Sequence, residues 1–214
     1  MASDNPNNKP PTATVDSGEG VLSQGVLPQG ILPQQRGPWI CHTRHTAYQN
    51  DWLSVSHEEV TTPAGTSGIY GVVHFHHTAV GVVALDEQQQ ITLVGQFRYP
   101  LNQFSWEIPE GGAKQQETTL ECAQRELQEE AGLSAEHWQP IMSLHTSNSV
   151  TDESAVVYMA TGLSSVAQTL EDTESDLQTR QVALSTAIDM IDKQEITDAI
   201  SVAAILKVAR ILNV

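Results

Sequence analysis

The feature that most constrains this chain is residues 105–133, where a glycine turn stands directly before an acidic helix. The two glycines that begin at Gly111 predict the turn, because glycine adopts positive φ without steric cost. Thr118 is a candidate helix N-cap with Glu121 three positions later, which is the spacing of a capping box. Gly132 is the predicted helix end. Four apolar residues recur at helical spacing and predict one buried stripe: Leu120, Ala123, Leu127 and Ala131.

Three carboxylates of the predicted helix share one face. Glu126, Glu129 and Glu130 stand at i, i+3 and i+4, so their side chains emerge together, beside the apolar stripe. Like charges this close destabilise an isolated helix, and a hard divalent cation that prefers oxygen ligands is the simplest compensation. On spacing alone a solvated acidic face is the favoured interpretation, because charge runs usually lie on the surface.

The complete pattern resembles the Nudix box of the Nudix hydrolase superfamily, with every defined position matched. The matching positions are Gly111, Glu117, Arg125-Glu126-Leu127, Glu129-Glu130 and Gly132-Leu133. The resemblance implies an α+β fold, built as an α/β/α sandwich around a mixed β-sheet with an N-terminal antiparallel β region. It also implies hydrolysis, dependent on Mg²⁺ or Mn²⁺, of a nucleoside diphosphate linked to another group.

The same resemblance implies a role for each residue of the pattern. Glu126 and Glu130 are the expected principal metal ligands, with the backbone carbonyl of Glu110 as an accessory ligand. Glu129 is expected to act as a further ligand or as a base. Structural support of the box falls to the remaining positions: Gly111, Glu117, Arg125 and Gly132.

The charge of the chain bounds its partners. With 26 acidic and 10 basic residues the formal charge is −16, which argues against nucleic-acid binding through a basic face. No apolar stretch approaches membrane-spanning length, and no basic region with an apolar core opens the chain, so we expect a cytoplasmic protein without membrane association. Cys41 and Cys122 are the two cysteines, and neither a structural disulfide nor a cysteine metal site is expected.

The composition divides the chain near residue 36. Residues 1–36 are rich in Asn, Pro, Ser, Gly and Gln and include a five-residue repeat, which predicts a flexible tail. Residues 37–214 form the predicted hydrolase domain, with an N-terminal β subregion at 37–75 and a core at 76–214. Predicted strands are 39–46, 53–61, 69–76, 78–85, 91–98, 104–108, 138–145, 155–162 and 178–183, and predicted later helices are 186–193 and 198–212.

Residues outside the box resemble the ADP-ribose pyrophosphatase branch of the superfamily. The segments that carry this resemblance are Gln96-Phe-Arg-Tyr-Pro and Trp106-Glu-Ile-Pro-Glu-Gly-Gly, together with residues 50–60, 68–73 and 194–199. Arg98 is then a candidate contact to a substrate phosphate, because its planar fork of donors suits phosphate. A surface ion pair explains Arg98 equally well. Glu107 is expected to hold the substrate or the neighbouring arginine, and a purely structural role is an equal alternative.

The polar segment at residues 147–153 is a candidate source of the general base. In the ADP-ribose branch a loop at this position often reads Ser-Pro-Gly-x-Ser-Asp-Glu, and Glu153 matches its final glutamate. This chain has Asn148-Ser149 where Pro-Gly is common, which leaves room for nucleotide sugars other than ADP-ribose. The alternative is an ordinary polar loop that caps a strand or helix.

Three histidines stand close together at positions 74, 76 and 77. His74 and His76 share a face of the predicted strand while His77 points away, so zinc would lack ligands. Ordinary surface or partly buried histidines are therefore expected.

The resemblance also implies a small-molecule nucleotide-sugar substrate and a homodimer in which N-terminal strands exchange between subunits. Trp52 and Tyr70 are then candidate base-stacking residues, although core packing is the simpler role for both. The leading function is hydrolysis of ADP-ribose or a related nucleoside diphosphate-sugar to a nucleoside monophosphate and a sugar phosphate. Two alternatives stay open: another substrate such as GDP-mannose, ADP-glucose or a diadenosine polyphosphate, or a non-catalytic ADP-ribose-sensing module.

Overall fold

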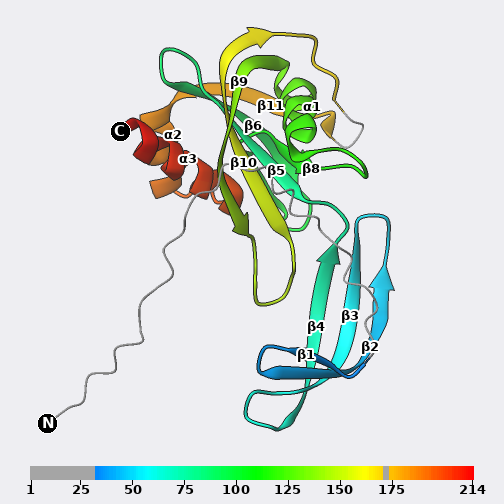
Figure 1. The fold of residues 1–214 in the computed structure, drawn as a ribbon. Coiled ribbons are helices and arrows are strands. Elements are labelled where there is room, and N and C mark those ends of the chain that lie inside the picture. The colour runs from blue at the N-terminus through cyan, green and yellow to red at the C-terminus, as the bar shows by residue number, and fades with distance from the viewer. Residues whose placement is uncertain (1–31, 171–173) are drawn as a thin grey trace, which may run out of the picture.

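The computed structural model describes residues 32–170 and 174–214, and its N-terminal part is a separate antiparallel sheet. The strand order is β1-β2-β3-β4. Its strands are β1 (Gln34–Arg36), β2 (Trp39–Gln49), β3 (Leu53–Thr61) and β4 (Ser67–Phe75). Figure 1 shows this sheet, in blue to cyan, extending away from the rest of the chain. Residues 34–36, which the composition places in the tail, pair with β2. Residues 1–31 of that tail lie outside the described residues.

Two further sheets form the centre of the core. One is mixed, with order β8-β5-β10-β9, because β10 runs parallel to β5 while the other neighbours are antiparallel. Its strands are β5 (Ala79–Ala84), β8 (Glu110–Gly112), β9 (Leu133–His145) and β10 (Ser154–Ser165). The other is antiparallel, with order β11-β6-β7, and contains β6 (Gln90–Arg98), β7 (Gln103–Glu107) and β11 (Gln178–Ala183).

Helices cover both faces of these core sheets. α1 (Thr119–Ala131) lies on one face, and α2 (Leu184–Asp192) and α3 (Ala199–Leu212) lie on the other (Figure 1). Strand β5 is buried on both sides: Val80 and Val82 face the cluster around α1, whereas Val83 belongs to the cluster that contains α3. A strand covered on both faces reads as a continuous apolar run, as Ala79–Ala84 does. This arrangement confirms the predicted α/β/α sandwich.

Gly81 in the middle of β5 permits a close approach between the layers. A Cβ atom at this position would lie 2.9 Å from Cδ1 of Ile108 and 3.0 Å from Cγ2 of Ile200 on α3. Next to this contact, the buried Ser201 accepts a hydrogen bond on its Oγ from the backbone N–H of Ile108, at 3.0 Å. α3 therefore packs directly behind the segment that leads into β8.

Helix α1 begins and ends as its sequence predicts. The Thr118 side chain accepts from the Glu121 backbone, the Glu121 carboxylate accepts from the Thr118 N–H, and Gly132 closes the helix at φ 62°. The predicted apolar stripe is wrong at Leu120, which is 37% exposed. The buried face is rotated relative to that stripe and consists of Cys122, Ala123, Glu126, Leu127 and Glu130. Two of the three helix carboxylates thus lie within the buried face rather than beside it.

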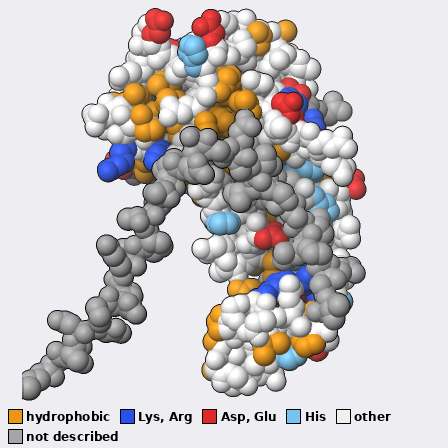
Figure 2. Space-filling model, viewed as in Figure 1, with side chains coloured by type: hydrophobic (Ala, Val, Ile, Leu, Met, Phe, Trp, Pro, Cys, Tyr) orange, Lys and Arg blue, Asp and Glu red, His pale blue; other side chains and the backbone are white. Residues whose placement is uncertain are grey.

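The surface shows little gathering of basic charge. Figure 2 shows the Lys and Arg side chains of the described residues in small, separate groups on the face in view. No helix within residues 32–170 and 174–214 is both long and apolar enough to cross a membrane.

Candidate active site

The site is built where β8 meets the buried face of α1. β8 pairs with the start of β5, which brings Glu110 opposite Gly81 and Gly112 opposite Ala79. The backbone N–H of Glu110 donates to Oε2 of Glu130 at 2.8 Å. A Cβ atom on Gly111 would lie only 2.1 Å from Oε1 of Glu126. A side chain at this position would therefore displace the Glu126 carboxylate. The predicted positive-φ turn is wrong here, because Gly111 lies in strand β8 and does not have a positive φ.

Burial sets the electrostatics of these carboxylates. Desolvation raises the pKa of Glu126 to about 7, although the neighbouring Arg125 opposes the shift. It raises the pKa of Glu130 to about 9 against the opposing hydrogen bond from the Glu110 N–H. The pKa of Glu110 is also raised well above its ordinary value, first by burial and then by the charge of Asp198. Ionised carboxylates in such a place need a positive charge beside them.

Arg125 supplies part of that charge and also ties the box together. Its Nε and Nη2 donate to the two oxygens of Glu117, at 2.8 and 3.0 Å, which lowers the pKa of Glu117. Its Nη1 donates to Glu126 at 2.7 Å and to Glu129 at 2.8 Å, and its Nη2 reaches the carbonyl of Gly112 at 3.2 Å. These contacts are those expected of a support for the loop and helix.

The carboxylates are suitable donors for a hard divalent cation. Oε2 of Glu110 is buried and has no hydrogen-bond partner among the described residues, and the buried oxygens of Glu126 and Glu130 are donors of the kind that Mg²⁺ prefers. Glu126 and Glu129 both accept hydrogen bonds from Nη1 of Arg125. Within residues 32–170 and 174–214, no three His, Cys, Asp or Glu side chains are grouped as a complete metal site. The assignment of Glu126, Glu129, Glu130 and Glu110 as ligands stays a prediction.

Arg98 and Glu107 form an ion pair at the edge of this site. Nε of Arg98, at the end of β6, donates to both oxygens of Glu107 on β7 at 3.0 Å, and Nη2 contacts the same carboxylate. Nη2 also lies 3.3 Å from Glu110. Burial alone would lower the pKa of Arg98, but the hydrogen bond and charge of Glu107, together with the charges of Glu110 and Glu130, raise it above its ordinary value. Glu107 is buried while Arg98 is one-third exposed, so Glu107 orients the arginine and the arginine faces outward.

Glu153 lies at the same end of the mixed sheet as the box loop. Ala155 of β10 pairs with Ala79 of β5, and Ala79 pairs with Gly112 of β8. The Glu153 carboxylate accepts a hydrogen bond from Oγ1 of Thr146 at 2.5 Å, and its backbone N–H donates to Oγ1 of Thr151 at 3.0 Å. The strand pairing therefore places Glu153 at the same end of the mixed sheet as the loop that precedes α1, although the two segments are distant in sequence.

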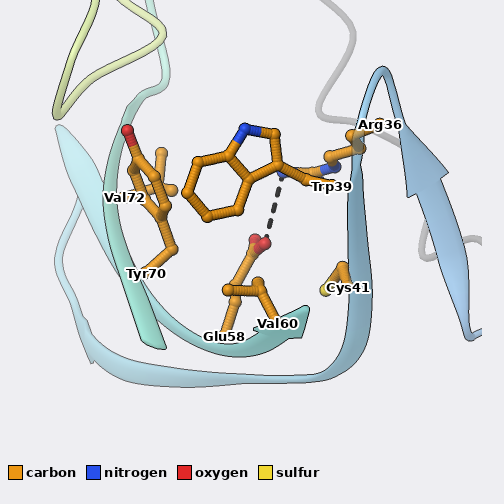
Figure 3. A pocket seen from close by; sticks show the side chains of 7 residues that line it. All are labelled: Arg36, Trp39, Cys41, Glu58, Val60, Tyr70 and Val72. Carbon is orange, nitrogen blue, oxygen red and sulfur yellow. Dashed lines mark hydrogen bonds and ion pairs between the residues drawn. The ribbon is translucent and has the colours of Figure 1, made fainter. Parts of the chain in front are cut away.

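A hollow in the N-terminal sheet is a feature that the sequence reasoning missed. It has a volume of about 200 Å³ and is lined by Arg36, Trp39, Cys41, Glu58, Val60, Tyr70 and Val72 (Figure 3). Glu58 is buried beneath it and pairs with Arg44 at 2.6 Å and with Arg36 at 3.3 Å. Glu58 alternates with the buried Ser56 and Val60 in β3, a period-2 signal that could have identified it. No box residue lines this hollow, so the carboxylate cluster of α1 is a different place.

The aromatic and histidine candidates do not form one cluster: Tyr70 and His74 lie on β4, whereas Trp52, His76 and His77 lie outside the strands. Trp52 is 67% exposed, and it is Trp39 that packs edge-to-face on Tyr70, with 5.6 Å between ring centroids. The three histidines have separate partners through Nδ1: the Asp152 carboxylate for His74, the Asp51 carbonyl for His76 and the Ala113 carbonyl for His77.

Comparison with known proteins gives consistent matches. Residues 75–200 match the family model described as NUDIX domain, and residues 39–73 match the nucleoside diphosphate sugar hydrolase N-terminal domain. The ADP-ribose pyrophosphatase of Mycobacterium tuberculosis is 33% identical over 158 residues, covering 73% of this chain and 76% of that protein. The ADP-ribose pyrophosphatase of Bacillus subtilis is 33% identical over 149 residues, covering 69% and 80%. The crystal structure of an ADP compounds hydrolase, 18% identical, superposes with a TM-score of 0.73 over 81% of this chain and 93% of that chain, which shows the shared fold.

Proposed function

The chain belongs to the Nudix hydrolase family, and we propose that it hydrolyses the diphosphate bond of ADP-ribose or a related nucleoside diphosphate-sugar. The products from ADP-ribose are AMP and ribose 5-phosphate. Support for this substrate class comes from the relatives that are ADP-ribose pyrophosphatases and from the matching N-terminal domain of nucleoside diphosphate sugar hydrolases.

The carboxylates of the box would hold the divalent cation that Nudix hydrolases generally use. Glu126 and Glu130 would supply buried carboxylate oxygens, the backbone carbonyl of Glu110 would be an accessory ligand, and Glu129 would complete the set as a further ligand or a base. A bound Mg²⁺ or Mn²⁺ would neutralise the diphosphate and stabilise charge on the leaving phosphate. Beside that positive charge the carboxylates would stay ionised, although burial by itself favours their protonated forms.

Arg98 contacts a phosphate oxygen of the substrate through the part of its guanidinium that faces solvent. Glu107 keeps the guanidinium in place, because its carboxylate accepts hydrogen bonds from both Nε and Nη2 of Arg98 and so defines the plane of the group. This ion pair reduces the cost of ordering a long side chain when substrate binds.

Glu153 accepts the proton of the attacking water. As the water oxygen forms its bond to one phosphorus, the anhydride P–O bond breaks and the electron pair stays with the leaving phosphate. The hydrogen bond from Thr146 orients the Glu153 carboxylate.

The single observation that carries this proposal is the contact between Glu126, Glu130 and the backbone of β8. Both carboxylates are buried against Gly111 and Glu110, which a merely solvated acidic face would not require. A non-catalytic sensing module is disfavoured because such modules usually lose acidic residues of the box, and here all of them are present.

The test is phosphate release, coupled to a phosphatase, from ADP-ribose, ADP-glucose, GDP-mannose, NADH and diadenosine polyphosphates. Each is measured with Mg²⁺ and with Mn²⁺, for the wild type and for Glu153→Gln. We expect the highest kcat/KM for ADP-ribose and a loss of about 10²-fold or more in the variant. A higher kcat/KM for another nucleotide sugar would identify that compound as the better substrate. Binding of ADP-ribose without turnover of any substrate would favour the sensing module.

Homodimer formation and a cytoplasmic location stay predictions. The exchanged-strand dimer would elute from a size-exclusion column at twice the chain mass of 23.3 kDa. A monomeric elution volume would contradict it.

A further inference from the structure

The loop between β9 and β10 is fastened to the N-terminal sheet rather than standing free. Val73 of β4 donates its backbone N–H to the carbonyl of Val150 at 2.9 Å and accepts from the N–H of Asp152 at 3.3 Å. The hydroxyl of Tyr70 donates to the carbonyl of Ser149 at 2.9 Å. Thr151 pairs with Val73 as an isolated parallel bridge. Residues 146–153 thus lie along β4, about 80 residues away in sequence.

His74 is the side chain that joins this loop to the interior of the N-terminal sheet. Its Nδ1 lies 2.5 Å from Oδ2 of Asp152, and its Nε2 lies 3.0 Å from Oγ of Ser56 on β3. Ser56 donates to Oε1 of Glu58 at 3.3 Å, and Glu58 is held by Arg44. A continuous chain of polar contacts therefore runs from the loop to the buried carboxylate of the sheet.

Glu153 stands between this attachment and the first residue of β10. Asp152 is its neighbour in the chain, and within the described residues the hydrogen bonds of the Glu153 backbone and carboxylate go to Thr151 and Thr146 of the loop. Several loop positions are exposed, so the loop has no apolar core of its own to hold its shape. A displacement of about 1 Å at a reacting group can cost about 10²-fold in rate.

From these contacts we infer that His74 is a positioning residue, which acts through Asp152 to hold the loop 146–153, and with it Glu153, at the edge of the active site. The inference rests on the proposed function, since it takes Glu153 as the base. It gives the N-terminal sheet a part in catalysis within one chain, separate from any contribution to binding the substrate.

Two substitutions separate the two contacts of His74. The amide nitrogen of asparagine takes the place of Nδ1 and can still donate to Asp152, whereas the amide of glutamine takes the place of Nε2 and reaches only Ser56. We expect His74→Ala and His74→Gln to lower kcat about tenfold to hundredfold, with KM changed less than about threefold. His74→Asn should recover most of the lost kcat.

His76→Ala is the matched control, because His76 contacts the carbonyl of Asp51 and no residue of the loop 146–153 in the described chain. It should keep the wild-type kcat. Asp152→Ala should reproduce the effect of His74→Ala, and the double variant should be no slower than either single variant, since one contact is being removed twice.

Hydrogen exchange of the full-length protein, followed by mass spectrometry on the peptide that spans residues 146–153, tests the attachment without any substrate. We expect faster exchange of this peptide in His74→Ala and His74→Gln, and wild-type exchange in His74→Asn and His76→Ala. Unchanged exchange in His74→Ala would overturn the inference whatever the activity shows. Faster exchange with unchanged kcat would also overturn it, because the loop would then be held without consequence for catalysis. An inactive wild type overturns the proposed function instead, and exchange alone then decides whether His74 holds the loop.

Discussion

Glu58 in the N-terminal sheet and Glu130 in α1 are buried to nearly the same extent, at 2% and 1% exposure, but their charges are compensated differently. Glu58 pairs with two arginines, at 2.6 and 3.3 Å. Glu130 accepts one backbone hydrogen bond from Glu110, and burial raises its pKa to about 9. A buried carboxylate with its own cations is part of the structure, whereas one without them marks a place for a cation from outside.

Glu130→Gln should produce the largest effect and should act on turnover alone. The variant removes a donor for the cation, whose electrostatic contribution of several kcal/mol corresponds to a loss of about 10³-fold or more in kcat/KM. Stability should be unchanged or higher, because Gln resembles the protonated form that burial favours. Phosphate-release kinetics and urea unfolding measure the two quantities. Glu87→Gln, the same change on the exposed β5–β6 hairpin, is the control, and equal activity of both variants would refute the role of Glu130.

Glu58→Gln should give the opposite result. It leaves Arg36 and Arg44 without their carboxylate, and breaking such a buried pair should cost about 3 kcal/mol of unfolding free energy. Glu59→Gln changes the next residue, which is exposed, and should leave the urea midpoint unchanged. If the two variants unfold at the same urea concentration, the arginine pairs contribute nothing and the contrast between the two buried carboxylates fails.

Without divalent cations, the stability of the fold should depend on pH, because the buried carboxylates of Glu126 and Glu130 become charged as the pH rises. The pKa values of Glu126 and Glu130 are raised from 4.5 to about 7 and about 9, so the folded state favours the protonated forms. This contribution is complete below about pH 4.5 and is lost as the pH rises toward 9. In EDTA the melting temperature should therefore fall between pH 5 and pH 9, and Mg²⁺ at pH 8 should raise it. The Glu126→Gln, Glu130→Gln double variant should show a flatter profile and no response to Mg²⁺.

Gly111→Ala tests how closely the β8 backbone approaches the helix. The added methyl would displace the Glu126 carboxylate, and we expect kcat/KM to fall about 10²-fold with about 1–3 kcal/mol of destabilisation. Gly71→Ala in β4 is the matched control, because the nearest atom to its Cβ, the carbonyl oxygen of Ser56, is 4.0 Å away. Steady-state kinetics that are alike for the two variants would show that the helix relaxes to accommodate the methyl.

The smallest expected effect is a difference in reactivity between two thiols, that of Cys41 in the N-terminal sheet and that of Cys122 in α1. Burial raises the pKa of Cys41 to about 11 and that of Cys122 to about 12, so neither should react with iodoacetamide in the folded protein at pH 8. Cys41 and Val60 are the buried apolar residues of the N-terminal sheet, and neither belongs to the two core clusters. Cys41 should therefore become reactive at lower urea than Cys122, as judged by mass spectrometry of labelled peptides. Simultaneous labelling would indicate that the two regions unfold together.

Local patterns predicted the parts of the fold that depend on neighbouring residues. The capping box at Thr118, the left-handed Gly132 and the alternation of β3 each depend on a few adjacent positions, and all three agree with the structure. The exposure of Leu120 could not be predicted, because it depends on how α1 is rotated to bring Glu126 against Gly111.

Contacts between distant segments account for what the sequence did not reveal. The His74–Asp152 and Arg44–Glu58 pairs join residues whose separations, 78 and 14 positions, carry no periodic signal. The family resemblance supplied the candidate box residues, but the three-way attachment of Arg125 to Glu117, Glu126 and Glu129 became visible only with the side chains placed.

The close approach at Gly81 lets α3 pack directly behind the segment that leads from Ile108 into β8. Because Gly81 has no side chain, Ile200 of α3 and Ile108 both pack into the space over its backbone. Ser201 holds Ile108 as well, because its Oγ accepts a hydrogen bond from the Ile108 backbone N–H. We assign no metal ligand to α3. A truncation or a fused tag that loosens this helix should nevertheless shift Glu110 and lower the rate of hydrolysis. The first turn of α3, 93 positions further along the chain, thus helps to hold the segment that leads into β8.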